Sequence, residues 1–254
     1  MEKITVNDIT LAFTRHGKGT PLVLVHGYPL DHTTWDEVVP HLEDDFDLIL
    51  PDLRGFGESE ALETPYTLTD MAGDLAALLD HLGIQQACMA GHSMGGYIAL
   101  AFARAWPGRL RGLGLVASQA LADTPERRRA RYESAAVVMR DGVGQVAETM
   151  SAALTPVARV QAFVRDLIAA QRPAGAAGAL KAMAGREDST PILSSFQFPV
   201  VVVHGDADAL VPAERAREVK AALSQAWLVE LPGVGHMPML EAAGATAEAL
   251  KHLL

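Results

Sequence analysis

Gly91-His92-Ser93-Met94-Gly95-Gly96 joins two apolar segments of different length. The preceding run, Gln86–Ala90, predicts a short buried strand, and the following run, Tyr97–Trp106, is long enough for a buried helix. A strand-to-helix junction of the form Gly-x-Ser-x-Gly is typical of a sharp, strained turn that holds the serine hydroxyl clear of the backbone. The flanking glycines lack the Cβ atoms that would collide in such a turn. We therefore interpret Ser93 as a candidate nucleophile rather than as part of a Gly-rich helix N-terminus that holds an anion.

Short apolar runs on both sides of this junction predict the other strands of a sheet. They are Leu22–Val25, Asp47–Leu50, Leu113–Val116, Pro199–Val203 and Trp227–Leu231. At the start of the chain, the alternation over Ile4–Arg15 predicts a hairpin that turns at Asn7-Asp8. Apolar residues spaced by three and four over Leu68–Leu82 predict a helix that ends at Gly83. Strands that alternate with helices predict an α/β fold with a parallel sheet covered on both faces.

Residues 120–186 interrupt this alternation, because they contain no convincing strand and are rich in Ala, Arg and Met. Proline and glycine are expected to divide this stretch into several short helices, at Pro125, Pro156, Pro173, Gly175, Gly178 and Gly185. The strand pattern then resumes, which favours a helical cap over the carboxyl edge of the sheet rather than a separate helical domain. We predict a core formed by residues 1–119 and 187–254 and a cap formed by residues 120–186.

Charge and composition exclude several classes of partner. The formal net charge of −10 and the pI near 5.3 argue against nucleic acid, whose phosphates require a basic surface. The arginine cluster at Arg127-Arg128-Arg129 and Arg131 is interpreted as a solvated helix face, with an anion site as the alternative. No apolar run has the length of a membrane span, and the N-terminus reads as a strand rather than a signal peptide. We therefore expect a cytoplasmic protein with no membrane partner, whose single Cys88 is a small buried filler.

Two later loops supply the groups that a serine nucleophile requires, namely a base and a carboxylate that orients the base. Asp208 follows the Pro199–Val203 strand in a Gly-x-x-Asp-x-x-x-Pro pattern, and we favour it over Asp206, which is better placed to fix the turn. His236 lies in the Pro/Gly-rich stretch Pro232–Pro238 just after the last predicted strand. The order Ser93, Asp208, His236 is the order expected for a triad built on this kind of turn.

An oxyanion requires two backbone N–H donors near the serine. We predict that Met94 supplies one and that Tyr28, in the loop after Leu22–Val25, supplies the other, because Pro29 has no N–H. His26 is expected to support this loop by hydrogen bonding, and His92 is expected to be a packed neighbour rather than a second base.

The remaining signals are weaker. Candidate pocket residues, each with simple core packing as the alternative, are Pro29, Trp35, Met139, Met150 and Met183. The Gly-rich stretch 52–59 lacks the spacing of a phosphate-binding loop, so we expect a structural loop with an Asp–Arg pair. The histidines show neither H-x-x-x-H nor H-E-x-x-H spacing, so we predict no metal site, and the predicted chemistry needs no cofactor.

With these residues assembled, the chain resembles the α/β-hydrolase superfamily over essentially its full length. The resemblance is carried by His26-Gly27, 52–59, Gly91–Gly96, Gly205–Pro212 and Gly235-His236. It is strongest to small carboxylesterases, 3-oxoadipate enol-lactonases and the non-haem haloperoxidase/perhydrolase group. The resemblance implies an α/β-hydrolase fold with an eight-stranded, mostly parallel sheet, an antiparallel second strand, flanking helices and a helical cap inserted after strand six.

Departures from related groups narrow the expected activity. Ser93 stands where dehalogenases and epoxide hydrolases carry an aspartate, and His26-Gly27-Tyr28-Pro29 departs from the His-Gly-x-Gly-Pro-Gly loop of carbon–carbon bond hydrolases and the His-Gly-Gly-Gly loop of hormone-sensitive-lipase-like esterases. We therefore predict a serine hydrolase of small to medium carboxylic esters, with a lactonase as the alternative and hydrogen peroxide as an acyl acceptor in a side reaction. A hypothesis from another class is a slowly hydrolysing ligand receptor that signals through its cap. In each enzymatic case the partner is a small-molecule ester or lactone.

Overall fold

Alternating side chains along the strands divide the hydrophobic core between the two faces of one sheet. The computed structural model describes all residues, Met1–Leu254. In β3 (Thr20–Val25), Leu22 and Leu24 belong to one buried cluster, whereas Val23 and Val25 belong to the other. This period of two follows from the pleat, which points successive side chains to opposite faces. Every residue of β7 (Val200–Gly205) is buried, as expected for a parallel strand with both faces covered.

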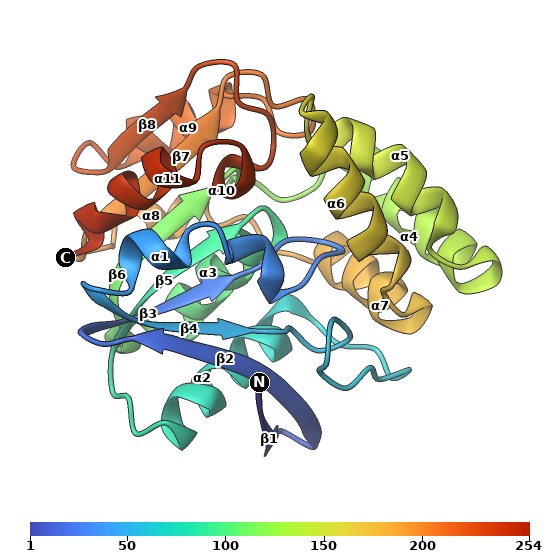
Figure 1. The fold of residues 1–254 in the computed structure, drawn as a ribbon, viewed down its shortest axis with the longest axis horizontal. Helices are drawn as coiled ribbons and strands as arrows, with labels where there is room; N and C mark the ends of the chain where they lie inside the picture. Colours follow the sequence, from blue (N-terminus) through green and yellow to red (C-terminus); the bar gives the residue numbers. More distant parts are fainter.

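The sheet has eight strands in the order β1-β2-β4-β3-β5-β6-β7-β8 (Figure 1). The other strands are β1 (Glu2–Val6), β2 (Ile9–Gly17), β4 (Phe46–Pro51), β5 (Ala87–His92), β6 (Leu110–Val116) and β8 (Trp227–Leu231). β2 runs antiparallel to both β1 and β4, and all pairs from β4 to β8 are parallel. This topology confirms the predicted sheet, including its antiparallel second strand. The turn between β1 and β2 also falls at the predicted residues, where Asn7 and Asp8 adopt φ angles of 46° and 64°.

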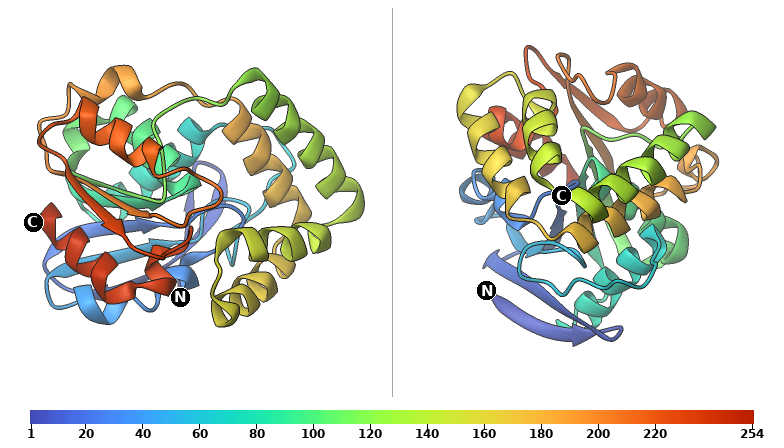
Figure 2. Two further views of the ribbon diagram at one scale, coloured as in Figure 1. Left: turned by 90° about the horizontal axis from the view of Figure 1, so that it is seen from above. Right: turned by 90° about the vertical axis from the view of Figure 1, so that its right-hand side faces the viewer.

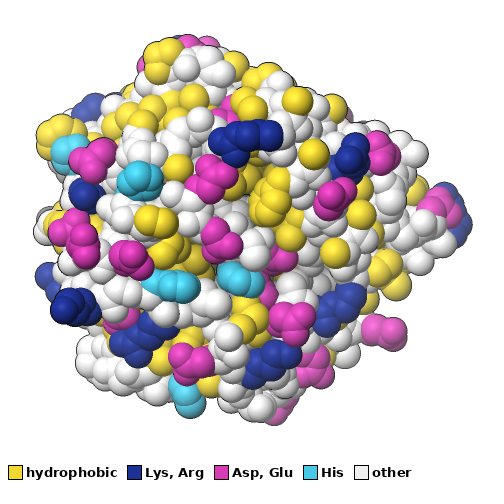
Figure 3. Space-filling model, in the orientation of Figure 1, with side chains coloured by type: hydrophobic (Ala, Val, Ile, Leu, Met, Phe, Trp, Pro, Cys, Tyr) yellow, Lys and Arg dark blue, Asp and Glu magenta, His cyan; other side chains and the backbone are white.

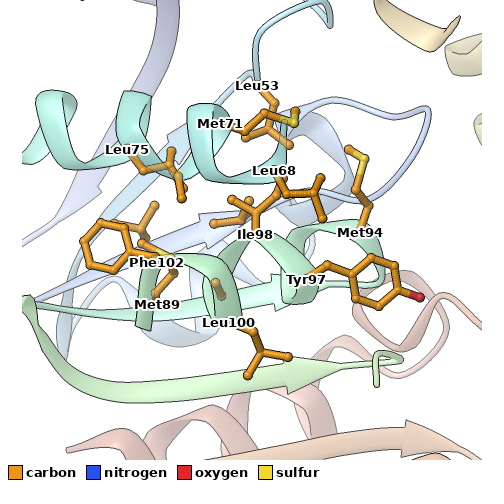
Figure 4. Close-up of a cluster of buried hydrophobic side chains, with 14 of the residues drawn as sticks. Leu53, Leu68, Met71, Leu75, Met89, Met94, Tyr97, Ile98, Leu100 and Phe102 are labelled. Carbon is orange, nitrogen blue, oxygen red and sulfur yellow. The ribbon is translucent and has the colours of Figure 1, made fainter. Parts of the chain in front are cut away.

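Helices cover both faces of the sheet. One face carries α2 (Leu68–His81), α3 (Met94–Ala105), the short α8 (Thr190–Leu193) and α9 (Glu214–Ala222). The close-up in Figure 4 shows apolar side chains of α2 and α3, such as Leu68 and Ile98, meeting over Met89 of β5. The opposite face carries η1 (His32–Trp35), α1 (Val39–Leu42), α10 (Pro238–Glu241), α11 (Ala243–Leu250) and η3 (Lys251–Leu253). A further short turn of helix, η2 (Pro107–Arg109), connects α3 to β6.

Four helices between β6 and β7 form the helical layer, which lies beyond the carboxyl ends of the parallel strands (Figures 1 and 2). They are α4 (Pro125–Asp141), α5 (Gly144–Leu154), α6 (Ala158–Ala169) and α7 (Pro173–Ala184). The chain enters and leaves this layer at one point, where the Ser189 backbone N–H donates to the Ala120 carbonyl at 2.9 Å. Arg186 strengthens the junction, because its Nε donates to the Leu121 carbonyl at 3.1 Å.

The prediction that Gly175 and Gly178 end a helix was wrong, because both lie within α7. Their role is close packing. A Cβ on Gly175 would lie 1.9 Å from the carbonyl oxygen of Gly55, and one on Gly178 would lie 2.7 Å from the ring of Tyr66. The helix therefore rests with its backbone directly on the loop after β4, a contact that only glycine allows.

The surface carries charges of both signs, and the single cysteine lies in the interior. Acidic and basic side chains are interspersed over the face drawn in Figure 3, with no continuous basic area on that face. None of the helices combines the length and the apolar character that crossing a bilayer requires. Cys88 is fully buried in β5, and burial raises the pKa of its thiol to about 11. The predicted role of this cysteine as a buried filler is thus confirmed.

Candidate active site

Ser93 stands at the carboxyl end of β5, on the turn into α3. Its backbone has φ 49° and ψ −111°, outside the regions that non-glycine residues ordinarily adopt. Two close approaches force the turn, because a Cβ on Gly91 would lie 2.2 Å from the Gly95 carbonyl carbon, and one on Gly95 would lie 2.3 Å from the Val25 carbonyl oxygen. The Ser93 side chain makes no hydrogen bond within the protein and faces a cavity described below.

The backbone around Ser93 is held from the neighbouring strand. Ser93 N donates to the Val116 carbonyl at 2.9 Å, and Ser118 Oγ donates to the Ser93 carbonyl at 2.8 Å. Val116 is the last residue of β6, which is adjacent to β5 in the sheet, and Ser118 follows shortly after it. The strained turn is therefore fixed by hydrogen bonds that involve its own N–H and C=O groups.

His236 and Asp208 come together from the loops after β8 and β7. His236 Nδ1 lies 2.6 Å from Asp208 Oδ2, and both side chains are almost completely buried. Because a carboxylate accepts only, Nδ1 donates in this bond, so in the neutral ring Nε2 carries the lone pair. His236 lines the same cavity as Ser93.

Hydrogen bonds around Asp208 favour the ionised form of its carboxyl. Burial alone would raise the pKa of its carboxyl, but hydrogen bonds from His236 and from the backbone N–H groups of Val211 and Leu210 outweigh burial and lower the pKa below its usual value. A second histidine, His204, lies with Nε2 3.4 Å from Asp208 Oδ2 and donates to the Val211 carbonyl at 2.8 Å. His204 was not predicted, although it immediately precedes the Gly205–Pro212 motif.

The other carboxylates of these loops serve the backbone. Asp206 is exposed, and its Oδ1 accepts a hydrogen bond from Gly233 N at 2.6 Å, which ties the loop after β7 to the loop after β8. Glu241 accepts hydrogen bonds from Gly235 N at 2.8 Å and Met237 N at 3.1 Å, on either side of His236. Sequence reasoning missed Glu241, because its only signal is its position in the short helix that follows the histidine loop.

Two backbone N–H groups near Ser93 are free of protein acceptors. Met94 is the first residue of α3, so its N–H has no acceptor within the helix. Tyr28 N donates no hydrogen bond within the protein. The loop that carries Tyr28 is supported by His26, whose Nδ1 lies 2.9 Å from the Gly27 carbonyl and whose Nε2 accepts from Leu53 N at 3.0 Å.

His92 is buried behind the site rather than exposed to it. Its Nε2 lies 2.8 Å from the carbonyl oxygen of His236, so the ring holds the backbone of the histidine loop. Burial, reinforced by the neighbouring His236, lowers the pKa of His92 to about 3. The ring is therefore neutral at ordinary pH and acts as a packed neighbour, as the sequence predicts.

Ser93 and His236 share a cavity of about 160 Å³ at the boundary between the strand ends and the helical layer. It is lined by Tyr28, Ser93, Tyr97, Arg127, Arg131, Met150, Leu180, Met183, Leu210, Val211 and His236. Of the predicted pocket residues, Met150 and Met183 lie in this lining.

Three other predicted pocket residues lie elsewhere. Trp35 is completely buried in the core, at the end of η1 and on the same face of the sheet as α1 and α11. Met139 is 51% exposed on the outside of α4. Pro29 is buried beside Tyr28 but does not line the cavity. The residue types indicated apolar contacts with a ligand. Trp35 and Pro29 are buried away from the cavity lining instead, and Met139 is exposed to solvent.

Comparison with known proteins places this arrangement in a family. The family described as "alpha/beta hydrolase fold" matches residues 20–243, which include Ser93, Asp208 and His236. The chain belongs to the α/β-hydrolase family. An esterase from Thermogutta terrifontis, solved with malate bound, is 38% identical with a TM-score of 0.95, over 99% of this chain and 97% of that one. The enol-lactonase of Burkholderia xenovorans LB400 is 26% identical with a TM-score of 0.91, over 99% of each chain.

This α/β-hydrolase also resembles part of a larger protein. It is 34% identical over 233 residues to the dihydrolipoyllysine-residue acetyltransferase component of the acetoin cleaving system of Pseudomonas putida. The match covers 89% of this chain and 60% of the Pseudomonas protein, so the chain spans less than two thirds of that relative.

The arginine cluster of the hydrolase differs from its predicted role as a solvated helix face. Arg127, Arg128 and Arg129 are exposed and Arg131 is half-buried, but Arg127 and Arg131 also line the cavity. Both also approach Asp123, Arg131 through a short contact from Nε and Arg127 through Nε at 3.5 Å. Their spacing of four residues, continued back to Asp123, is the signal that marks one common helix face.

The loop after β4 in the hydrolase is structural, as predicted, but its ion pairs are different. Arg54 forms a two-pronged ion pair with Asp74 of α2, with Nε–Oδ2 at 2.5 Å and Nη2–Oδ1 at 2.6 Å. Asp52 instead accepts from His32, with Nδ1 2.6 Å from Oδ1. Asp31, His32 and Asp52 place ligand-type atoms within 4.8 Å of one another, yet each of these groups is already bound by protein donors or acceptors.

Proposed function

We propose that this protein is a serine hydrolase of small carboxylic esters that works through an acyl-enzyme. The observation that carries the proposal is the strained turn at Ser93, with φ 49°, facing the cavity that His236 also lines. A strained backbone persists only where surrounding structure enforces it, and such strain concentrates at reactive residues. Similarity to an esterase of 38% identity supports the same activity.

The proposed reaction assigns one role to each group. Ser93 Oγ attacks the ester carbonyl carbon while His236 Nε2 takes the hydroxyl proton, and Asp208 stabilises the resulting imidazolium. The C–O bond to the alcohol then breaks, and His236 returns the proton to the leaving oxygen. Water repeats the sequence on the acyl-enzyme, releases the acid and restores Ser93.

The developing oxyanion is proposed to accept hydrogen bonds from the N–H groups of Tyr28 and Met94. Neither donor has to give up a protein acceptor to bind it, so the site is organised before the substrate arrives. Removing one such donor from a hydrolase site typically lowers kcat by about 10²- to 10³-fold.

The substrate is expected to be small. The cavity of about 160 Å³ lies below the roughly 300 Å³ at which pockets for drug-sized ligands begin. We therefore expect acetyl to butyryl groups to match this volume better than long acyl chains.

Hydrolysis of p-nitrophenyl esters from acetate to decanoate, by wild type and by Ser93→Ala, tests this function. We expect multiple turnovers by the wild type, an optimum at short chains and a loss of about 10³-fold or more in the variant. Hydrolysis that survives in Ser93→Ala would contradict the mechanism. A single slow turnover by the wild type would instead favour the ligand receptor.

Lactone hydrolysis is the second candidate, favoured by the similarity to an enol-lactonase. The same groups would open a cyclic ester, with the ring oxygen as the leaving group that remains attached to the acyl chain. Titration of the released acid measures the rates at which γ-butyrolactone, δ-valerolactone and the linear ester ethyl acetate are hydrolysed. Comparison of these rates separates lactonase from esterase activity.

A further inference from the structure

Three guanidinium groups converge on a single carboxylate, Asp123, in the segment that leads from β6 to α4. Arg131 contacts it through Nε, Arg127 through Nε at 3.5 Å, and Arg186 through Nη1 at 2.8 Å. Asp123 is 1% exposed, Arg186 4% and Arg131 13% by side chain, so these three groups are shielded from water, whereas the side chain of Arg127 is 46% exposed. Three positive charges against one negative charge leave an excess of two positive charges beside the cavity.

Most of the donors of Arg127 and Arg131 remain unused by the protein. Each guanidinium carries five N–H donors. Arg131 donates from Nε to Asp123 and from Nη1 to the Met183 sulfur at 3.4 Å, while its Nη2 donates no hydrogen bond. Arg127 makes no side-chain hydrogen bond, since its nearest approach to Asp123 is 3.5 Å. Both residues line the cavity that contains Ser93 and His236.

A neutral donor stands in the same cavity. Tyr28 is 8% exposed and lines it, yet the Tyr28 hydroxyl has no hydrogen-bond partner. The positive charge of Arg131 reaches this hydroxyl, since it opposes the rise in the pKa of Tyr28 that burial causes. A buried polar group without a partner is costly, so a ligand that satisfies it gains binding energy.

We propose that the substrate of this site is an ester or lactone that carries a free carboxylate, bound by Arg131, Arg127 and the Tyr28 hydroxyl. The inference rests on the proposed ester hydrolysis and names its substrate class, such as the monoester of a short dicarboxylic acid. A planar carboxylate matches the fork of a guanidinium and accepts from two donors at once. The other walls of the cavity, Met150, Leu180 and Met183, are apolar and would contact the carbon chain between the two ends.

Matched substrates separate this recognition from ester hydrolysis itself. Monomethyl succinate and methyl pentanoate have similar lengths and the same leaving group, but only the first carries a carboxylate at the far end. With hydrolysis followed by titration at pH 7.5, we expect wild-type kcat/KM to be about tenfold or more higher for monomethyl succinate.

Arg131→Gln removes the charge and the fork. We expect kcat/KM for monomethyl succinate to fall by about 10- to 100-fold, mostly through KM, while methyl pentanoate changes by less than about threefold. Arg127→Gln, at a more exposed position, should act in the same direction by a smaller factor, and Arg131→Lys should recover part of the loss. Arg129→Gln is the matched control, because Arg129 is exposed on the same helix and does not line the cavity.

Calorimetric titration of succinate into Ser93→Ala tests the carboxylate site without turnover. Binding that Arg131→Gln abolishes supports the site even if neither ester is hydrolysed, in which case only the proposed ester hydrolysis fails. Hydrolysis of methyl pentanoate as fast as monomethyl succinate, or an equal loss for both esters in Arg131→Gln, overturns the inference and leaves ester hydrolysis intact. Absence of both hydrolysis and succinate binding overturns both.

Discussion

The loops at the strand ends and the helical layer meet at one cavity, but they hold their residues in different ways. Ser93, Asp208 and His236 are fixed by backbone hydrogen bonds close to the strands, such as Ser93 N to the Val116 carbonyl at 2.9 Å. Arg127 and Arg131, across the cavity, are fixed through side-chain contacts with Asp123. One half of the site is thus built from main-chain geometry, and the other half is built from long side chains.

This difference assigns a rigid role to the strand-end loops and an adaptable role to the side chains of the helical layer. Proposed proton transfers tolerate only small displacements, so the groups that take part in them require a backbone held in one position. Arginine and methionine side chains can adopt other rotamers to meet a ligand of different shape. We therefore expect changes in the loops to alter rate and changes in the helical layer to alter substrate preference and stability.

The largest expected effect comes from the loops, in Asp208→Asn. The amide would favour the wrong tautomer of His236 and could not stabilise the imidazolium, so we expect kcat for p-nitrophenyl acetate to fall by about 10⁴-fold. Asp206→Asn is the matched control, because the amide oxygen can still accept from Gly233 N. Steady-state kinetics of the two variants check this, and an equal loss in both would show that the loop rather than the Asp208 charge matters.

A smaller effect is expected in the helical layer, from Gly175→Ala. Alanine favours the helix by about 1 kcal/mol at most, but its Cβ would lie 1.9 Å from the Gly55 carbonyl oxygen, which is backbone and cannot rotate away. We expect a net destabilisation of about 1–3 kcal/mol and a Tm lower by roughly 2–10 °C. Gly144→Ala, where nothing lies within 4 Å of the new Cβ, should leave the Tm unchanged or slightly raised. Calorimetry of both variants decides, and equal Tm values for both would contradict the close contact.

The smallest expected effect is on the pH dependence of the free energy of unfolding, and it comes from His92, which supports the histidine loop. Folded His92 has a pKa near 3 against about 6.5 when unfolded, so between these values the unfolded chain binds one more proton. The free energy of unfolding should therefore fall as the pH drops through this window, by about 1.4 kcal/mol per pH unit from His92 alone. In His92→Gln the amide can still donate to the His236 carbonyl but cannot titrate, so the slope should decrease by that amount. Urea unfolding between pH 4.5 and 6 measures it, and an unchanged slope would rule out His92 as a source.

The strand-end loops are readable from sequence because each signal is local. Ser93 sits between glycines that two close approaches require, and Asp208 and His236 each follow a strand within a few residues. Because each of these three segments follows a strand of a parallel sheet, all three lie at the same edge of that sheet. The supporting residues Glu241 and His204 and the lining residues Leu210 and Val211 escaped prediction, because their contacts have no sequence pattern of their own.

The helical layer is less readable because its contacts are between segments distant in sequence. α4 is polar on nearly all sides, so hydropathy cannot separate the inward Arg127 and Arg131 from the outward Arg129. From sequence alone Gly175 indicates a helix break, and only its close contact with the Gly55 backbone explains a glycine at this position. Helix boundaries and helix faces in this layer are decided by tertiary packing, which overrides local propensity.

A single backbone hydrogen bond, from Ser189 N to the Ala120 carbonyl, closes the chain around the whole helical layer. Both cavity arginines and both cavity methionines are therefore encoded by one contiguous stretch of gene, whereas Ser93, Asp208 and His236 are encoded outside it. Recombination that replaces this stretch leaves two ends that still meet, and each doubling of its length costs only about 0.6 kcal/mol in closure entropy. We therefore expect exchange of this stretch to change the arginine and methionine wall of the cavity, while Tyr28 and the proposed chemistry stay where they are.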